Sequence, residues 1–260
     1  MDKYASVLKP LMPLLAAAYG LVLIYVTALP TSGESQGVVG EALTWLFSLA
    51  GIALTLFLVC RVEPRLFSAA SQFPLKRWRL SVFVGFLLLA PLWLTLEGYI
   101  VYGLTSLVHA VQMEPLHYTD AELREDLLAS VHAVLLAPVL EELCFRQMAI
   151  SPFRRRGAMI AVCIVMALLF GMLHVRNFPG AFLSAMVYGM VFICTRNIWY
   201  SVALHAGHNL AVTLLAVYCW LGIGNLQMTR TPVIILADWK IVVSGIILAA
   251  MGIMLIKAKR

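Results

Sequence analysis

A succession of long apolar runs, separated by short charged connections, limits the fold of this chain more than any other feature. Hydrophobic residues make up 62% of the 260 residues and charged residues 12%, whereas about 25% of a soluble domain is charged. Helices satisfy their own backbone hydrogen bonds in lipid. We therefore expect an all-α, polytopic membrane helix bundle, forming a single integral membrane domain over residues 1–260. About eight transmembrane helices are expected, at residues 10–29, 38–60, from 80 to beyond 98, 127–150, 158–174, 181–195, 199–220 and 241–256.

Charged residues at the ends of these runs indicate how the helices are oriented. Lysine and arginine are enriched in cytoplasmic connections. With eight helices and both termini in the cytoplasm, Arg196 and the basic segments 61–79, 154–156 and 257–260 share the cytoplasmic side, and the acidic segment 117–126 lies outside. The net charge of +6 is thus an orientation signal, and we expect no nucleic-acid partner. The first run is expected to remain as a membrane span rather than to be cleaved as a signal.

Two further details of the connections carry predictions. Thr119 followed by Asp120 and Glu122 predicts the N-terminus of a helix, since acids favour the first turn. Glu97 follows an apolar stretch already long enough to span a membrane, and Tyr99 lies beside it. We expect Glu97 at the far membrane interface, where aromatic residues gather.

The fourth run contains the ionisable residues Glu141, Glu142 and Arg146. A charged residue inside a bilayer costs about 2.5 kcal/mol or more, so such groups indicate function by default. The alternative is an internal ion pair that only locks helices together. Glu142 and Arg146 are four residues apart and share a helix face, whereas Glu141 is rotated by about 100°. This spacing predicts that Arg146 holds Glu142 ionised while Glu141 faces a cavity.

Two other runs carry unusual polar side chains. His174 ends the fifth run, four residues after Phe170; alone, such a histidine is more often an interfacial residue. In the seventh run, His205 and Asn209 share a helix face, and His208 points about 50° away. The small residues between the two histidines, at positions 206 and 207, leave space for a ligand or for a close helix neighbour.

The depths of these groups in the membrane agree in part. At 1.5 Å per residue, Glu141 and Asn209 each lie about 20 Å from the basic end of their run, and His205 about 14 Å. These values are compatible with a shared site near the midplane. His174 lies about 27 Å from Arg156, so the fifth helix must be tilted or broken, or must begin along the membrane surface.

The three motifs, Glu141-Glu142-x-x-x-Arg146, Phe170-x-x-x-His174 and His205-x-x-x-Asn209, resemble those of the CPBP family of intramembrane proteases. That family includes the type II CAAX prenyl endopeptidases and bacteriocin-processing or immunity proteins. The resemblance covers the segment 127–215, which would be the catalytic core.

The resemblance implies an intramembrane endopeptidase that hydrolyses a peptide bond of a membrane-associated protein or peptide. Glu141 would activate a water molecule, and His174 would hold that water or donate to it. His205 and Asn209 would stabilise the oxyanion, while Glu142 and Arg146 would support the first acid. His208 lies outside the family pattern and is given no role.

The sequence indicates the cofactor and the substrate less directly than it indicates the candidate catalytic residues. A zinc ion held by Glu141, His174 and His205 is possible in principle, but the sequence has no HExxH pair and Asn209 would be an unusual ligand. We favour a glutamate-type mechanism without a cofactor. The expected partners are the lipid bilayer and a membrane protein or lipid-modified peptide. The short chain without appended domains favours the cytoplasmic membrane of a prokaryote over the endoplasmic reticulum.

Two other functions are open at this point. One is a non-catalytic immunity or scaffold protein of the same fold, although binding alone requires neither a base nor two histidines. The other is a proton-coupled transporter, in which intramembrane glutamate and histidine also occur. Transporters often contain internal repeats, and we find none in this sequence.

Overall fold

The structure is a computed structural model of the chain. It describes residues 18, 38–62, 79–107, 113–115, 118–174, 177–222, 227–229 and 234–235. The predicted membrane helices at 10–29 and 241–256 fall almost entirely outside these ranges, so the count of eight helices and the position of the termini stay predictions.

The described part of the chain is helical apart from three short strands, as expected for the all-α class. In chain order the elements are α2 (Val38–Val62), α3 (Leu80–Ser106), β1 (Met113–Pro115), α4 (Asp120–Leu135), α5 (Ala137–Glu142), the π-helix η4 (Leu143–Met148), α6 (Arg156–Leu173), α7 (Phe178–Thr195), α8 (Ile198–Trp220), β2 (Gln227–Thr229) and β3 (Ile234–Ile235).

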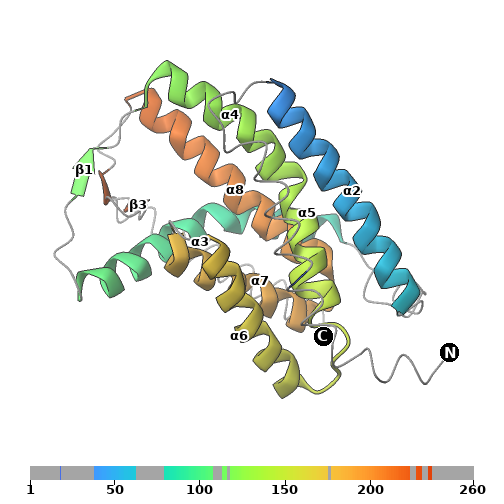
Figure 1. Cartoon of the computed structure of the whole chain (residues 1–260). Coiled ribbons are helices and arrows are strands. Elements are labelled where there is room, and N and C mark those ends of the chain that lie inside the picture. The colour runs from blue at the N-terminus through green and yellow to red at the C-terminus, as the bar shows by residue number, and fades with distance from the viewer. Residues whose placement is uncertain are drawn as a thin grey trace.

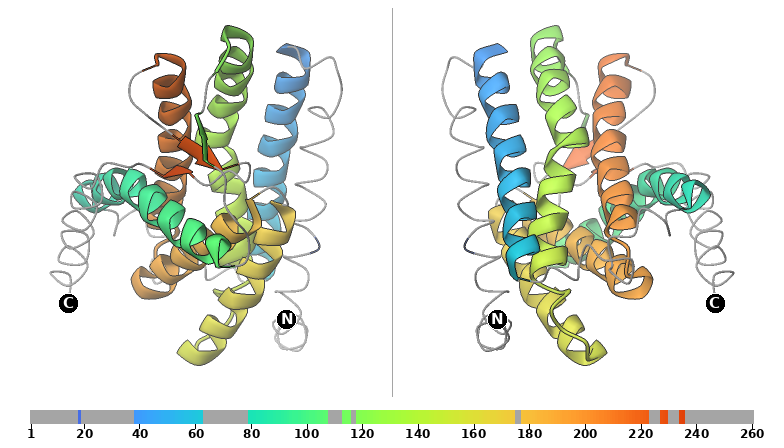
Figure 2. Two further views of the ribbon diagram at one scale, coloured as in Figure 1. Left: turned by 90° about the vertical axis from the view of Figure 1, so that its left-hand side faces the viewer. Right: turned by 90° about the vertical axis from the view of Figure 1, so that its right-hand side faces the viewer.

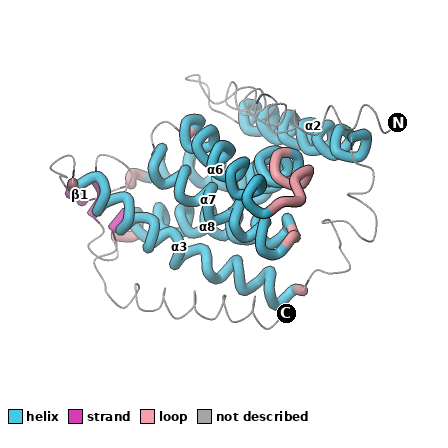
Figure 3. Tube along the Cα trace, turned by 90° about the horizontal axis from the view of Figure 1, so that it is seen from below, coloured by secondary structure: helices cyan, strands magenta, loops and turns pink. Residues whose placement is uncertain are grey.

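The helices pack so that the elements carrying the three motifs meet in the middle of the bundle. Helices α2, α4 and α8 lie side by side, and α3 crosses α8 (Figures 1 and 2). Seen from below, α6, α7 and α8 lie next to one another between α2 and α3 (Figure 3). One core cluster joins η4, α6, α7 and the start of α8, and a second joins α3, α7 and α8.

Five described helices are long and apolar enough to cross a membrane, and α2 contains a shorter apolar segment, Ala42–Phe57. Many large apolar side chains on these helices are exposed, among them Leu46, Leu88, Val165 and Leu214. Such a surface suits hydrocarbon, in which only closed hydrogen-bonded structures such as helices are stable. The chain is a multi-pass membrane protein.

The fourth span is not one regular helix, contrary to the simplest interpretation of its apolar run. Thr119 caps the N-terminus of α4 and exchanges hydrogen bonds with Glu122, as predicted. The α-helix is interrupted at Leu136, two residues before Pro138, because proline lacks an N–H and its ring crowds the preceding turn. A π-helical turn then starts directly after Glu142; π-turns are rare and occur frequently at functional sites.

Basic residues gather at one end of the bundle. Arg154, Arg155 and Arg156 are exposed at the start of α6, and the Arg156 guanidinium approaches Cys194 of α7. Burial, followed by the proximity of Arg154 and Arg156, lowers the pKa of Arg196 in the turn between α7 and α8. The basic connections 154–156 and 196 therefore meet at one end, as the charge pattern predicts, although the side of the membrane that they face stays a prediction.

A small sheet, which the sequence did not predict, joins two connections at the other end. Strand β1 precedes α4, and β2 and β3 follow α8; they pair antiparallel in the order β1-β2-β3. Beside the sheet, the Trp220 indole at the end of α8 donates to Asp120 at the start of α4, at 2.8 Å. The segments before α4 and after α8 thus share one end of the bundle, as the predicted topology requires.

Helices α3 and α8 approach each other closely at Gly207. A Cβ atom at Gly207 would lie 2.8 Å from the Ala90 Cβ and 2.8 Å from the Leu87 carbonyl oxygen. Of the two uses foreseen for the small residues between the histidines, the structure therefore shows the close helix neighbour. This contact fixes the position of α3 over the part of α8 that carries His205 and His208.

We predict that Gly207→Ala lowers the free energy of unfolding by about 1–3 kcal/mol, because the methyl group overpacks the α3–α8 contact. Gly103→Ala in α3 is the matched control, since a Cβ there meets nothing within 4 Å and a helical alanine is favoured over glycine by about 0.5–1 kcal/mol. Denaturant titration of both variants in bicelles gives the comparison. Equal stabilities would contradict the close packing of α3 on α8.

Candidate active site

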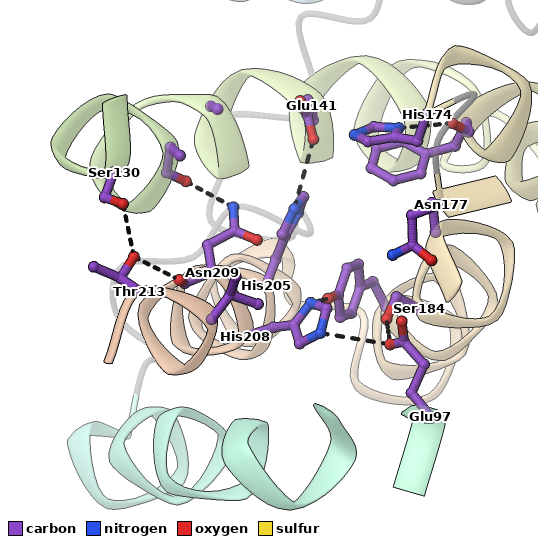
Figure 4. A pocket seen from close by; sticks show the side chains of 16 residues that line it. Glu97, Ser130, Glu141, His174, Asn177, Ser184, His205, His208, Asn209 and Thr213 are labelled. Atoms are coloured by element: carbon purple, nitrogen blue, oxygen red, sulfur yellow. Dashed lines mark hydrogen bonds and ion pairs between the residues drawn. The ribbon is translucent and has the colours of Figure 1, made fainter. Parts of the chain in front are cut away.

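The three motifs line one cavity of about 350 Å³ inside the bundle. Its walls come from α3, α4, α5, α7, α8 and the end of α6 (Figure 4). The lining residues are Glu97, Ser130, Ala133, Ala137, Glu141, Phe170, His174, Asn177, Ala181, Ser184, Tyr188, His205, His208, Asn209, Val212 and Thr213.

A buried ion pair lies directly behind this cavity. The Arg146 guanidinium contacts Glu142 Oε1 at 3.0 Å, and both side chains are almost completely buried. The same guanidinium donates to the Ala185 carbonyl oxygen at 2.8 Å. The predicted pairing of Glu142 with Arg146 is present, and neither residue lines the cavity.

Two aromatic rings enclose the Arg146 charge. Its guanidinium carbon lies 5.5 Å from the Phe170 ring centre and 5.6 Å from the Tyr188 ring centre. Cations are attracted to aromatic faces at such distances, most strongly when water is excluded. The ion pair therefore has carboxylate, carbonyl and aromatic partners, which together offset the cost of burying its charges.

His205 connects the buried pair to the cavity. Its Nδ1 atom lies 3.0 Å from Glu142 Oε1, and its Nε2 atom lies 3.6 Å from Glu141 Oε2. The imidazole also stacks on Tyr188, with ring centres 4.6 Å apart. Because the Glu142 carboxylate accepts hydrogen bonds, we assign a proton to Nδ1, which leaves Nε2 facing Glu141. This bridge between the adjacent glutamates was not foreseen from the sequence.

Glu141 faces the cavity, as its helical spacing predicts. Its side chain is 16% exposed, whereas that of Glu142 is fully buried. Figure 4 shows the Glu141 carboxylate pointing down towards His205. The two neighbouring acids therefore lie in different surroundings: one contacts a guanidinium in a dry core, and the other borders open space.

His174 lines the same cavity, although the count along the sequence left its depth unexplained. It ends α6, which is inclined to α4 and α8 (Figure 2), in agreement with the tilted alternative. The His174 Nδ1 atom lies 2.8 Å from the Phe170 carbonyl oxygen, and its ring stacks on Phe170 at 4.4 Å. A carbonyl only accepts hydrogen bonds, so Nδ1 carries the proton and the neutral ring keeps a lone pair on Nε2.

Asn209 lies one helical turn after His205 on α8 and also lines the cavity. Its Nδ2 atom donates to the Ala133 carbonyl oxygen at 2.7 Å, in the last turn of α4. A carboxamide has two N–H donors, and this contact uses one of them. The contact ties α8 to α4 and fixes the direction of the carboxamide.

The wall beside α3 holds a second polar group that sequence reasoning missed. We expected Glu97 at the membrane interface, but it lies inside the bundle. It is 96% buried and lines the cavity. The error arose because α3 continues for nine residues beyond Glu97, to Ser106, so the acid lies inside the helix rather than at its end. An acid followed by a further apolar stretch was the available signal.

Glu97 and His208 belong to one network on this wall. His208 Nε2 lies 3.5 Å from Glu97 Oε2, and His208 Nδ1 lies 2.8 Å from the Tyr188 hydroxyl. The Ser184 hydroxyl donates to Glu97 and accepts from the Trp93 indole at 2.7 Å. His208, which the motifs left without a role, therefore lies in the cavity wall and links Glu97 to the ring that stacks on His205.

The possible zinc ligands Glu141, His174 and His205 border one cavity but do not form a compact ligand set. Within the described residues, no group of three or more His, Cys, Asp or Glu side chains is arranged to hold a metal ion.

The comparison with protein families matches residues 123–211 to the model described as type II CAAX prenyl endopeptidase Rce1-like. No curated protein and no solved structure matches the chain. The matched segment runs from α4 into α8 and contains Glu141, Glu142, Arg146, His174 and Asn209. The match supports the family resemblance of the three motifs: over this segment, about a third of the chain, the protein is similar to the Rce1-like type II CAAX prenyl endopeptidases.

Proposed function

We propose that this protein is an intramembrane endopeptidase in which Glu141 activates a water molecule for attack on a peptide carbonyl. One observation carries the proposal: Glu141, His174, His205 and Asn209, from three separate spans, border one cavity. Base, water-holding group and hydrogen-bond donors are the groups that peptide hydrolysis needs. The substrate is a membrane-associated protein or peptide, lipid-modified or not.

Glu141 is the better base of the two adjacent glutamates. Glu142 contacts Arg146 and His205 through one oxygen and does not line the cavity. Glu141 borders the cavity and has no arginine or lysine partner within the described ranges. A water between Glu141 and the substrate carbonyl would thus meet a carboxylate whose lone pairs are not used by a cation.

His174 is suited to hold the attacking water. Because its Nδ1 proton is directed at the Phe170 carbonyl, Nε2 of the neutral ring accepts a hydrogen bond. A water that donates one proton to Glu141 and one hydrogen bond to His174 keeps its oxygen lone pair for the carbonyl carbon. Of the two roles considered for His174, holding the water fits this geometry better than donating to it.

His205 and Asn209 lie on the same face of α8 and would bind the developing oxyanion. The free N–H of Asn209 is one donor. Nε2 of His205, which lies 3.6 Å from Glu141 Oε2, is the second donor when it carries a proton. Fixed donors at an oxyanion contribute about 2.7–4 kcal/mol each to the lowering of the barrier.

The reaction then balances without another reactant. The water oxygen bonds to the carbonyl carbon while Glu141 takes the water proton, and the carbonyl electrons move to the oxyanion. When the electrons return, the C–N bond breaks and the proton on Glu141 passes to the leaving amine. The products are a carboxylic acid and an amine, and Glu141 is again ionised.

We predict that Glu141→Gln lowers cleavage by about 10²- to 10⁴-fold, the usual contribution of a general base, with unchanged thermal unfolding. Membrane proteomes from cells producing the wild type or this variant are compared for new peptide termini. Termini that persist in the variant would contradict the role of Glu141. An unchanged cellular phenotype would favour a scaffold protein, and altered proton flux in proteoliposomes would favour a transporter.

The neighbouring substitution Glu142→Gln is expected to act differently. It leaves the Arg146 charge buried without an anion, a change that typically costs about 3–5 kcal/mol of stability. The double variant Glu142→Leu/Arg146→Met should recover most of that stability, because replacing both charges by apolar groups is often neutral. Unfolding in bicelles measures all three proteins; a stable Glu142→Gln single variant would contradict the importance of the pair.

We also predict that cleavage by the purified protein survives treatment with 1,10-phenanthroline followed by dialysis, since Glu141 acts on water directly. Metal content is measured in parallel by mass spectrometry. Loss of cleavage that added zinc restores would instead indicate a zinc hydrolase with Glu141, His174 and His205 as ligands.

A further inference from the structure

The wall of the cavity formed by α3, the start of α7 and one face of α8 has no part in the proposed hydrolysis. It presents the Glu97 carboxylate, the Asn177 carboxamide and the His208 imidazole (Figure 4). The Glu97 side chain is only 5% exposed, yet it lines the cavity. We call these three residues the Glu97 subsite.

Gly180 lets the Glu97 and Asn177 side chains approach each other at the backbone of α7. A Cβ atom at Gly180 would collide with Glu97 Oε1 and would lie 2.7 Å from Asn177 Oδ1 and 2.8 Å from Asn177 Nδ2. The carboxylate and the carboxamide therefore meet at Gly180. Their oxygens accept hydrogen bonds, which suits a ligand that donates several.

The charges around the cavity make this a site for a positive group. Among the described lining residues, Glu97 and Glu141 are acids, and none is lysine or arginine. Arg146 contacts Glu142 behind the cavity wall, and its charge is already enclosed by Phe170 and Tyr188. The neighbours of Glu97 are the Ser184 hydroxyl and His208, so no permanent cation compensates its buried carboxylate within the described residues.

A buried carboxylate without a cation is costly, and a cation placed beside it recovers part of that cost. Ammonium groups offer three donors, which match the oxygens of Glu97 and Asn177. The stem of a lysine is aliphatic and tolerates apolar walls, such as those that Ala181 and Val212 provide in this cavity.

We propose that the Glu97 subsite binds the cationic side chain of a lysine in the substrate, next to the bond that is cut. This inference names the substrate class and in that respect rests on the proposed function.

The experiment measures binding separately from cleavage. The full-length protein in nanodiscs is titrated with n-hexylammonium, n-hexanol and hexanoate, which share the same alkyl chain, and binding is followed by saturation-transfer NMR. The wild type is expected to bind hexylammonium about tenfold more tightly than hexanol, and to bind hexanoate most weakly. A tenfold ratio is a small part of the attraction between two close opposite charges. Equal binding of hexylammonium and hexanol would overturn the proposal.

Matched variants assign the effect to one carboxylate. Glu97→Gln keeps an acceptor for the Ser184 hydroxyl and should abolish the preference for hexylammonium while leaving hexanol binding unchanged. Glu141→Gln removes the acid from the opposite wall and should keep the preference. Gly180→Ala leaves every charge in place but displaces the Glu97 and Asn177 side chains, because its methyl group collides with both, and should weaken hexylammonium binding. A preference that disappears in Glu141→Gln and survives in Glu97→Gln would overturn the assignment.

The two proposals can fail independently in this design. A preference for hexylammonium that requires Glu97, in a protein that cuts nothing, would disprove the peptidase and retain the cation subsite. Cleavage that requires Glu141, at sites without enrichment of lysine, would retain the peptidase and disprove the subsite as a determinant of specificity.

Discussion

The ion pair between Glu142 and Arg146 is the interaction on which the rest of the site depends. Neither charge is tolerable in an apolar bundle alone, so each requires partners from other helices. Arg146 contacts the Ala185 carbonyl and the faces of Phe170 and Tyr188, and these contacts hold α6 and α7 against η4. Glu142 contacts His205, which holds α8 against the same pair. The same contacts that neutralise the pair therefore fix the positions of the aromatic and imidazole rings around the cavity.

This arrangement explains why the two adjacent glutamates, Glu141 and Glu142, lie in different surroundings. The α-helix presents neighbouring residues about 100° apart, so a pair of acids at its end cannot share one environment. Glu142 points into the core and is matched by a guanidinium, whereas Glu141 points into the cavity, where His205 approaches it. The π-turn that follows Glu142 lies between the acid pair and the start of the basic connection to α6. A local irregularity of the backbone thus accompanies the most highly charged stretch of the bundle.

Features that depend on local spacing were predictable from the sequence, whereas features that depend on packing between helices were not. The i, i+4 relation of Glu142 to Arg146, the capping role of Thr119 and the exposed direction of Glu141 are all properties of a single helix, and the structure contains them. The contacts of Glu97 with His208 and of Tyr188 with His205 join residues on different helices, and no spacing rule encodes how far one membrane helix is shifted along another. The same limit applies to His174, whose position depends on the tilt of α6, and to the three-stranded sheet, which pairs segments more than 100 residues apart. The catalytic roles of Glu141, His174, His205 and Asn209 stay predictions.

The close approach of α3 to α8 separates two groups of polar residues in the cavity wall, and the motifs alone do not predict this separation. Gly207 lies between His205 and His208 and brings the α3 backbone within van der Waals distance of α8. On one side of this contact, His205 faces the paired glutamates; on the other, His208 faces Glu97. The groups proposed for hydrolysis all belong to the segment 123–211 that matches the Rce1-like family, whereas Glu97 belongs to α3, outside it. Substitutions in α3 could therefore alter which side chain the cavity accepts without changing any residue that acts on the peptide bond. The residue proposed for recognition and the residues proposed for hydrolysis thus lie on different sides of this contact, and α3 is held there by packing at Gly207 and by the contact of Glu97 with His208.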